Sequence, residues 1–519
     1  MMRVNIETQW ICEPPESIRG VPIYIIKLIN SLVLRNNNKY SISFFDPHSE
    51  QNNLKYMYDY IGGEALGSLE VFECNSTSYK MITDANIAGR PSLYDAVPYS
   101  AYTGARADVF HFPCPLTIPF NVDGRVVVTV HDMLPLLSRF SRYWSKAVCA
   151  STDASVRYME KQKDIILIAV SESTKNDIVE YSSISPERVH VVPQGYDKST
   201  HFPERNLGML SEMGIHAPYL LYLGALDFRK GVVEAIDAFE IAKPKFRDLK
   251  LILAGKLTSD IKPIHEMLAS CRYRSDVILP GYVNDEQKRA LLSSASIFLF
   301  PSEYEGFGFP VLEAMACGSP VITTNVSSLP EVGGDAVVYV APRDSEQLAF
   351  EIERLLNSDS LRKEYIQKGF DQSAKFSWER TAAMTEDVYD IAYEQIEMPS
   401  KYEQFELPSK KESAKKMRTV VYGIGRNFMK YKDEIYRKHQ VVLLVDNSDS
   451  VQGKVIDGLV VAHPSEMLSY EFDEILFTAS RPLVDEMVAS LIRDGIPTSK
   501  LKHFFFPIEI SIAHSDARD

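Results

Sequence analysis

Short apolar runs alternate with longer amphipathic stretches along most of the chain. The runs have the length of strands buried on both faces, and the stretches between them repeat their apolar residues with the period of a helix. The predicted strands lie at residues 4–6, 109–113, 126–130, 166–170, 189–192, 219–224, 251–256, 277–283 and 297–300. Alternation of this kind predicts an α/β protein built from parallel sheets.

The chain is too long for one hydrophobic core, and its pattern changes towards the C-terminus. Among its 519 residues, segment 399–416 is polar, rich in charge and interrupted by two prolines, which predicts a linker. A new alternation of apolar and amphipathic stretches starts near residue 417. We therefore predict two larger domains, at residues 1–200 and 201–380, and a small α/β domain at residues 417–519.

Composition and charge narrow the functional classes. A net charge of −14 argues against nonspecific binding of nucleic acid, which needs a basic surface. No apolar run is long enough to span a membrane and the N-terminus does not resemble a secretion signal, so we expect a cytoplasmic protein. The six cysteines contain no C-x-x-C pair, so we expect reduced thiols rather than a zinc site or a disulfide framework. Four lysines of the linker either belong to a solvated tether or contact the anionic inner face of the membrane: Lys410, Lys411, Lys415 and Lys416.

Two glutamates after the predicted strand 297–300 are the first candidate site residues. The segment that starts at Phe300 reads FPSEYEGFGFPVLEAMACGSPVITTNVSSLPE, with Glu305 in a loop and Glu313 about two turns into the following helix. A loop after a strand of a parallel sheet lies at the carboxyl edge, where such sheets bind ligands. Free N–H groups at the helix start favour an anionic partner. In the alternative interpretation, Glu305 caps a helix and Glu313 is a solvated surface residue.

This segment resembles the E-x7-E signature of the retaining GT-B glycosyltransferases of family 4, including the EGFG, EAMACG-PV and S-LPEV-G-A stretches. The resemblance covers roughly residues 1–395. It implies a GT-B fold, in which two Rossmann-like domains face each other across a cleft. It also implies that a helix at residues 381–398 crosses back to the first domain.

The same resemblance implies roles for the residues of the signature. Glu305 would face the hydroxyls of the donor sugar, and Glu313 would hydrogen-bond the ribose of the donor nucleotide. The turn formed by Gly306, Phe307 and Gly308 would offer backbone amides to the sugar and the phosphates.

Two adjacent cations follow the predicted strand 219–224, which ends in Gly224 at the expected donor-binding edge. Arg229 and Lys230 precede a predicted helix, where the helix dipole disfavours positive charge. Helix stability therefore does not explain these two cations, and a ligand-binding role would. The resemblance implies that they bind the donor diphosphate and stabilise it as a leaving group. A solvated charge pair is the alternative.

A histidine and a glycine of the first domain complete the candidate site. The segment VVVTVHDMLPLL resembles the HD-x-x-P pattern of the family, which implies that His131 reaches the donor sugar, whereas a lone histidine there is otherwise often structural. Its charge state stays open, and Asp132 either orients the ring or caps the next segment. Gly20 lies where the family often has a glycine pair, which implies that it faces a phosphate or the acceptor. In the alternative interpretation it is an ordinary turn glycine.

The small C-terminal domain contains part of a nucleotide-binding fingerprint. Gly423 and Gly425 end its first predicted strand, and Asp446 ends the second strand about twenty residues later, but Phe428 replaces the third glycine. The domain resembles the Rossmann-like accessory domain of several sugar-nucleotide dehydratases and acyltransferases. Ligand binding and a docking or oligomerising role both stay open.

The resemblance implies a retaining hexosyltransferase that uses a nucleoside-diphosphate sugar in bacterial surface polysaccharide or glycoconjugate synthesis. GDP-mannose is favoured over UDP-linked donors, while a saccharide, a lipid-linked saccharide and a protein all remain as acceptors. The first two domains contain no D-x-D triplet at a strand end, so we expect neither a metal nor another cofactor. A sugar-nucleotide 2-epimerase and a noncatalytic scaffold subunit of a glycosyltransferase complex are the alternative functions.

Overall fold

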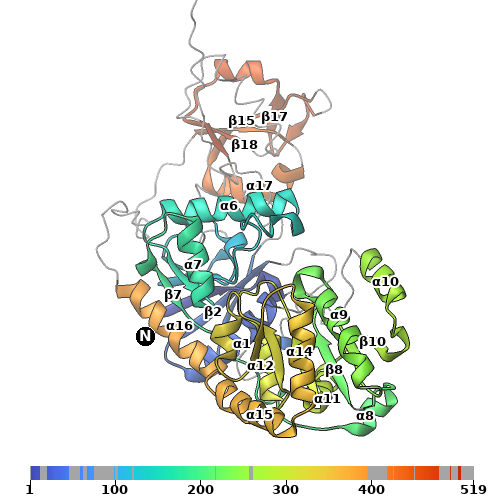
Figure 1. Cartoon of the computed structure of the whole chain (residues 1–519). Helices are drawn as coiled ribbons and strands as arrows, with labels where there is room; N and C mark the ends of the chain where they lie inside the picture. Colours follow the sequence, from blue (N-terminus) through green and yellow to red (C-terminus); the bar gives the residue numbers. More distant parts are fainter. Residues whose placement is uncertain are drawn as a thin grey trace, which may run out of the picture. The chain divides into compact units, whose positions relative to one another are not determined.

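The computed structural model describes residues 2–11, 20–45, 59–61, 67–74, 99, 103–119, 122–216, 218–255, 261–394, 418–424, 426–448, 451–477, 491 and 501–503. Their contacts define two units (Figure 1). The larger unit holds most of the described residues up to residue 394, and the smaller unit holds those from residue 418 onwards.

The N-terminal half of the larger unit is built around a sheet with the strand order β3-β2-β1-β4-β5-β6-β7. All of its described strand pairs are parallel. The strands are β1 Arg3–Glu7, β2 Lys39–Phe45, β3 Glu70–Cys74, β4 Val109–Phe112, β5 Arg125–Val130, β6 Ile166–Ala169 and β7 Val189–Val191. Its longer described helices are α1 Val21–Arg35, α6 Lys146–Lys161 and α7 Glu172–Tyr181.

The second half is built around a parallel sheet with the order β10-β9-β8-β11-β12-β13. The strands are β8 Tyr219–Leu223, β9 Lys250–Ala254, β10 Val277–Gly281, β11 Ile297–Phe300, β12 Val321–Thr324 and β13 Val338–Val340. The helices are α8 Leu207–Glu212, α9 Val232–Ala242, α10 Ile261–Ser270, α11 Asp285–Ser294, α12 Phe309–Ala316, α13 Leu329–Gly333, α14 Ser345–Leu356 and α15 Asp359–Ser373. The predicted α/β architecture with two parallel sheets is confirmed.

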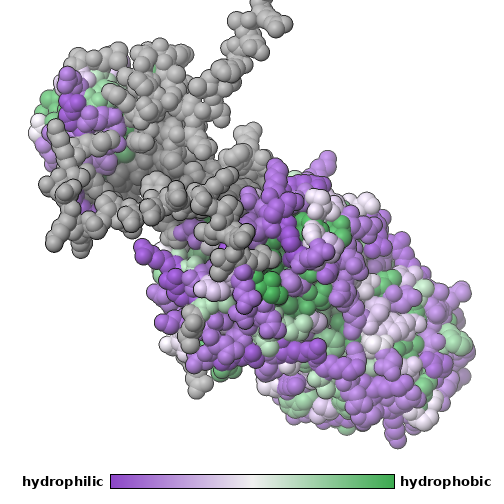
Figure 2. Space-filling view, turned by 90° about the vertical axis from the view of Figure 1, so that its left-hand side faces the viewer, coloured by the Kyte–Doolittle hydropathy of each residue, from purple (hydrophilic) through white to green (hydrophobic). Residues whose placement is uncertain are grey.

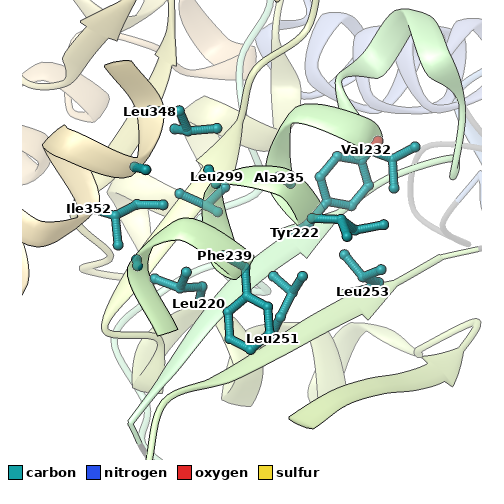
Figure 3. Packing of buried hydrophobic residues seen from close by; sticks show 14 of the residues in the cluster. Leu220, Tyr222, Val232, Ala235, Phe239, Leu251, Leu253, Leu299, Leu348 and Ile352 are labelled. Carbon is teal, nitrogen blue, oxygen red and sulfur yellow. The ribbon is translucent and has the colours of Figure 1, made fainter. Parts of the chain in front are cut away.

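The hydrophobic core of the second half explains why its elements form where they do. Side chains from β8, β9 and β11 meet those of α9 and α14 (Figure 3). Helix α9 contributes Val232, Ile236 and Phe239, which recur every three or four positions and are all buried. Each large apolar side chain buried in this way contributes about 1.5–3 kcal/mol of transfer free energy.

The strand orders determine where loops can form a site. In the first sheet the direction of winding reverses between β1 and β4, and in the second between β8 and β11. At such a switch point, the loops from the carboxyl ends of the two strands diverge and leave room for a ligand. The loop after β11 carries Glu305, and the loop after β8 carries Arg229 and Lys230.

Helix α16, Trp378–Glu394, joins the end of the second half to the first (Figure 1). It packs against α1 and β5, and its buried residue Glu386 accepts three hydrogen bonds. The donors are the Tyr40 hydroxyl at 2.6 Å, Arg35 Nε at 2.6 Å and Asn37 Nδ2 at 2.8 Å. One carboxylate therefore anchors the returning helix to the first domain.

The smaller unit has its own sheet, with the order β16-β17-β15-β14-β18-β19. Its elements are β14 Arg418–Tyr422, α17 Arg426–Lys438, β15 Gln440–Val445, β16 Val455–Ile456, β17 Leu459–Ala462, β18 Glu474–Phe477 and β19 Leu501–His503. Apart from the antiparallel pair β16–β17, the described pairs are parallel, and the winding reverses between β14 and β18. The predicted linker 399–416 lies outside the described residues.

On the face shown in Figure 2, the larger unit is mainly hydrophilic, with hydrophobic areas between the polar residues. None of the described helices combines the length and the apolar character needed to cross a bilayer. Four of the six cysteines lie among the described side chains and form no disulfide: Cys114, Cys149, Cys271 and Cys317.

Replacing Glu386 with glutamine should destabilise the larger unit. The change removes the charge facing Arg35 and leaves the buried Tyr40 hydroxyl with a weaker acceptor, so we expect a loss of about 2 kcal/mol. Urea unfolding of the full chain, followed by circular dichroism, measures the loss. Glu394→Gln, an exposed change on the same helix, is the control. Equal unfolding midpoints for the two variants would show that Glu386 is not an anchor.

Candidate functional site

The loops after β8 and β11 meet at the switch point of the second sheet. Gly231 has a φ of 75°, and a Cβ atom there would lie 2.1 Å from the carbonyl oxygen of Pro301. The backbone N–H of Glu303 donates to the carbonyl oxygen of Arg229 at 2.8 Å. Because only a glycine permits this approach, the two loops are held against each other.

This contact brings Arg229, Lys230 and Glu305 together. Lys230 Nζ lies 3.0 Å from Glu305 Oε1, and Arg229 Nη1 lies 3.8 Å from the same oxygen. Arg229 Nη1 also donates to the carbonyl oxygen of Tyr304 at 2.6 Å, and Ser302 Oγ donates to Glu305 Oε1 at 2.8 Å. The three charged side chains are between 12% and 20% exposed, so a ligand can still reach them. These three groups together carry one net positive charge, and the Asp132 side chain lies within electrostatic reach of all three.

The electrostatics of the cluster keep Glu305 ionised. Burial alone would raise the pKa of Glu305, but the charges of Lys230 and Arg229, with the hydrogen bonds from Ser302 and Lys230, lower its pKa below the usual value. Glu305 is therefore a carboxylate that accepts hydrogen bonds and does not supply a proton.

The turn after Glu305 contacts the first domain. A Cβ atom at Gly306 would lie 1.9 Å from the carbonyl oxygen of His131, and the Ser171 hydroxyl donates to the carbonyl oxygen of Gly306 at 2.8 Å. Gly308 has a φ of 117° and precedes α12 without a side-chain cap. Phe307 is 6% exposed and belongs to a hydrophobic cluster made mainly of second-domain residues.

Glu313 belongs to a second charge cluster. Its carboxylate lies 2.5 Å from Lys288 Nζ and 3.4 Å from His201 Nε2. Burial would raise the pKa of Glu313, but Lys288 and His201 lower it. Sequence reasoning missed both partners, because nothing in the sequence marks a contact between α11, α12 and the segment that contains His201. Helix α12 begins at Phe309, so the prediction that Glu313 lies about two turns into the helix was wrong: it lies just over one turn in.

His131 follows β5, with both ring nitrogens paired inside the protein. Nε2 lies 2.9 Å from the carbonyl oxygen of Pro113, which can only accept, and Nδ1 lies 3.2 Å from the amide nitrogen of Gln194. Burial lowers the pKa of His131 to about 4. The ring is therefore neutral with its proton on Nε2, which resolves the charge state that the sequence left open. Gln194 is a positioning residue that sequence reasoning missed.

The neighbours of His131 show how the ring is held. Asp132 Oδ1 accepts from the backbone N–H of Leu134 at 3.0 Å, so Asp132 caps the next segment and does not orient the His131 ring. Burial raises the pKa of Asp132. The ring of Tyr24 meets the imidazole edge-on, with centroids 4.9 Å apart.

The remaining glycine candidates, Gly224 and Gly20, both have a positive φ. Gly224 directly follows β8, and a Cβ atom at Gly255 would lie 1.8 Å from the Gly224 carbonyl oxygen. Gly20 has a φ of 50° and precedes α1, the helix that contains Tyr24. A Cβ at Gly20 would meet nothing within 4 Å, so packing does not explain this glycine.

A carboxylate from the second domain caps a helix of the first. Glu331 accepts from the backbone N–H groups of Glu172 and Ser173 at 2.7 and 2.8 Å, at the start of α7. Burial raises the pKa of Glu331 despite these bonds. Next to this contact is a cavity of about 400 Å³ whose lining includes Gln194 and Phe307. The two domains are thus in direct contact around the candidate site.

In the smaller unit, the carboxylate of Asp446 accepts hydrogen bonds from the backbone. Its two oxygens accept from the N–H groups of Ile424 at 2.6 Å and Ser448 at 2.8 Å. Gly423 has a φ of 96°, and Gly425 lies outside the described residues. The cavity found in this unit, about 390 Å³, is lined by residues of β15 and β17 and not by Gly423 or Asp446. Asp446 holds the turn after β14 in place.

Within the described parts of both units, no group of three or more His, Cys, Asp or Glu side chains is arranged to hold a metal ion. The cationic candidates for an anionic ligand are Arg229 and Lys230.

Comparison with known proteins shows which family this chain belongs to. Residues 215–372 match the model of the family glycosyl transferases group 1, and residues 415–501 match a family described as C2185-like, N-terminal. The MMP alpha-(1->4)-mannosyltransferase of Mycolicibacterium hassiacum is 30% identical over 325 residues, which cover 60% of this chain and 74% of the relative. The chain therefore belongs to the glycosyl transferases group 1 family.

The O-antigen chain mannosyltransferase B of Escherichia coli is 30% identical over 246 residues, 46% of this chain. The chain spans 65% of the length of that relative and about a third of three further Escherichia coli mannosyltransferases.

Among solved structures, the Anabaena protein Alr3699/HepE, crystallised with UDP and glucose, superposes with a TM-score of 0.57 at 16% identity. The match covers 75% of this chain and all of that one. With the two parallel sheets, this likeness establishes the GT-B fold that the sequence resemblance implied.

His131 should remain neutral at pH 5.5, where a solvent-exposed imidazole is mostly protonated. Between its unperturbed pKa of 6.5 and about 4, the unfolded chain binds a proton that the folded chain excludes, so stability falls as pH falls through this window. His131→Asn should flatten the decline in unfolding free energy over that range. It should not abolish the decline, because burial also lowers the pKa of His111, to about 3.

Urea unfolding at a series of pH values tests this, with the exposed His216→Asn as control. A decline as steep in His131→Asn as in His216→Asn would contradict the assignment.

Proposed function

We propose that this protein is a retaining hexosyltransferase that moves mannose from GDP-mannose to a hydroxyl group of an acceptor, in the synthesis of a bacterial surface polysaccharide or glycoconjugate. The observation that carries the proposal is the convergence of Arg229 and Lys230 on Glu305 at the switch point of the second sheet. The relatives include two mannosyltransferases at 30% identity, which supports mannose as the transferred sugar.

The cluster suits an anionic leaving group. Its two cations attract a diphosphate. The hydrogen bonds from Arg229 to the Tyr304 carbonyl oxygen and from Ser302 to Glu305 hold the groups in place before a ligand binds. Groups that are already oriented need no reorganisation when charge develops on the leaving group. Glu305, kept ionised, is an acceptor for the hydroxyls of the donor sugar.

In the proposed reaction, the bond between the anomeric carbon and the diphosphate oxygen breaks while the acceptor oxygen bonds to the same carbon. The acceptor hydroxyl attacks on the face that the diphosphate leaves, so the configuration is retained, and its proton passes to the departing diphosphate. Arg229 and Lys230 stabilise the negative charge on that group. Gly306, next to Glu305, lies against the carbonyl group of His131, so His131 of the first domain is close to this cluster.

Titration of the full chain with GDP-mannose and UDP-linked sugars, followed by heat release and by slow hydrolysis to the nucleoside diphosphate, tests the donor. Binding and hydrolysis of GDP-mannose alone support the proposal. Selective hydrolysis of a UDP-sugar would show that the donor is UDP-linked and not GDP-mannose. If no sugar nucleotide binds, the proposed function is wrong.

Lys230→Ala should slow hydrolysis of the donor about 10²–10³-fold, the usual cost of losing one fixed group that stabilises developing charge. Lys245→Ala is the matched control, because that lysine is 64% exposed and pairs with Glu353 on the surface. Thermal unfolding of both variants verifies that they are folded. A folded Lys230→Ala protein with the wild-type rate would remove Lys230 from the mechanism.

Chelation of divalent metals should leave the rate unchanged, because in this proposal Arg229 and Lys230 neutralise the diphosphate. The measurement is donor hydrolysis before and after dialysis against EDTA, with Mg²⁺ or Mn²⁺ added back. Loss of activity that either metal restores would show that the cations do not suffice.

A further inference from the structure

An exposed aromatic and cationic patch follows the candidate histidine in the first domain. Tyr143 and Trp144 are 37% and 40% exposed, and Arg139, Arg142 and Lys146 are exposed beside them in sequence. We call these five residues the aromatic patch. No acidic residue occurs from Met133 to Thr152, although the whole chain carries a net charge of −14. This segment is therefore a cationic stretch of an acidic protein, although Asp177 of α7 lies within electrostatic reach of Arg139.

The patch is built on a fixed backbone. Phe140, between two of its arginines, is 3% exposed and meets the ring of Tyr304 edge-on at 5.4 Å. The N–H groups of Tyr143 and Trp144 donate to the carbonyl oxygens of Phe140 and Ser141 at 2.9 and 3.1 Å. The exposed side chains are thus presented by an ordered turn.

Two of the patch side chains already contact each other. The Arg142 guanidinium lies 5.0 Å from the centroid of the Tyr143 ring, and its Nη2 donates to the Tyr143 hydroxyl at 3.1 Å. A cation beside an aromatic face can bind an anionic group while the other aromatic surface stays free. The arrangement pairs a flat apolar surface with a positive charge.

The patch adjoins the loop that carries Glu305. Tyr304, which packs on Phe140, directly precedes Glu305. Arg343 pairs with Glu303 at 2.7 Å in the same loop, and the Tyr143 side chain lies within electrostatic reach of Arg343. The patch therefore belongs to the rim of the candidate site, on the side of the first domain.

We propose that the aromatic patch is the subsite for the acceptor, and that the acceptor is a saccharide bearing a phosphate group. A sugar ring has an apolar face of C–H groups that stacks on Tyr143 and Trp144, while the phosphate pairs with Arg139, Arg142 and Lys146. This inference rests on the proposed function and names its acceptor class. An anionic membrane is the rival occupant, but it would not need a place beside the catalytic loop.

The test compares transfer with hydrolysis in the full-length protein. With GDP-mannose as donor, the acceptor probes are mannose 1-phosphate and the uncharged methyl α-mannoside. Trp144→Ala and Tyr143→Ala should each lower the ratio of transfer to hydrolysis about tenfold for mannose 1-phosphate, mainly through a higher acceptor KM. Arg142→Ala should remove the preference for mannose 1-phosphate over methyl α-mannoside. Tyr393→Ala, a change of a 45% exposed tyrosine on α16, is the matched control.

The results separate this inference from the proposed function. If the wild type hydrolyses GDP-mannose but the patch variants keep the transfer ratio of the control, only the acceptor inference is wrong. It is also wrong if the wild type transfers to neither probe. Absence of hydrolysis in the wild type overturns the proposed function and the inference with it.

Vesicles of phosphatidylcholine, with and without phosphatidylglycerol, test the rival. If the patch variants lose only vesicle binding, the patch is a membrane surface and the inference fails. If mannose 1-phosphate transfer is impaired in the absence of vesicles, the phosphate is recognised as part of the saccharide and not as part of a lipid surface.

Discussion

The burial of the Glu305 carboxylate is the constraint on which the site depends. An ionised carboxylate removed from water is costly unless it is paired and hydrogen-bonded. Lys230, Arg229 and Ser302 supply the partners, and they can do so only because the loops after β8 and β11 approach each other at Gly231. The order of the strands brings the two loops to the same edge of the sheet, Gly231 lets them touch, and the buried Glu305 carboxylate draws the two cations towards it. The same requirement leaves two cations oriented at the carboxyl edge of the second sheet.

The site also needs both domains. Gly306 and the carbonyl oxygen of His131 are too close for any larger residue at position 306, and Ser171 donates to the carbonyl oxygen of Gly306. Glu331 reaches across to the N–H groups that begin α7. Helix α16 then ties the end of the second domain to the first. These contacts hold His131 beside the Glu305 loop. The candidate site therefore contains residues of both domains and forms only when the domains are packed together.

Most of the strands could be predicted because parallel strands buried on both faces are continuous apolar runs, as residues 297–300 and 219–223 show. The family motif also placed Glu305, Arg229 and Lys230 in segments that follow strands, and His131 directly after a strand, as the structure has them. The pairing of Glu313 with Lys288 and His201, and of His131 with Gln194, could not be predicted. These partners come from other elements, and no local pattern reports which elements will pack together.

The sequence by itself determined the α/β class, the family and the residue types at the site, because periodicity and motif spacing are local properties of the chain. The tertiary structure decided the charge states and partners. It made His131 neutral by enclosing it between Pro113 and Gln194, and it kept Glu305 ionised by placing two cations against it. It also turned Asp132 and Asp446 towards backbone N–H groups. Burial and the positions of distant charges set these properties, and both exist only once the chain has folded.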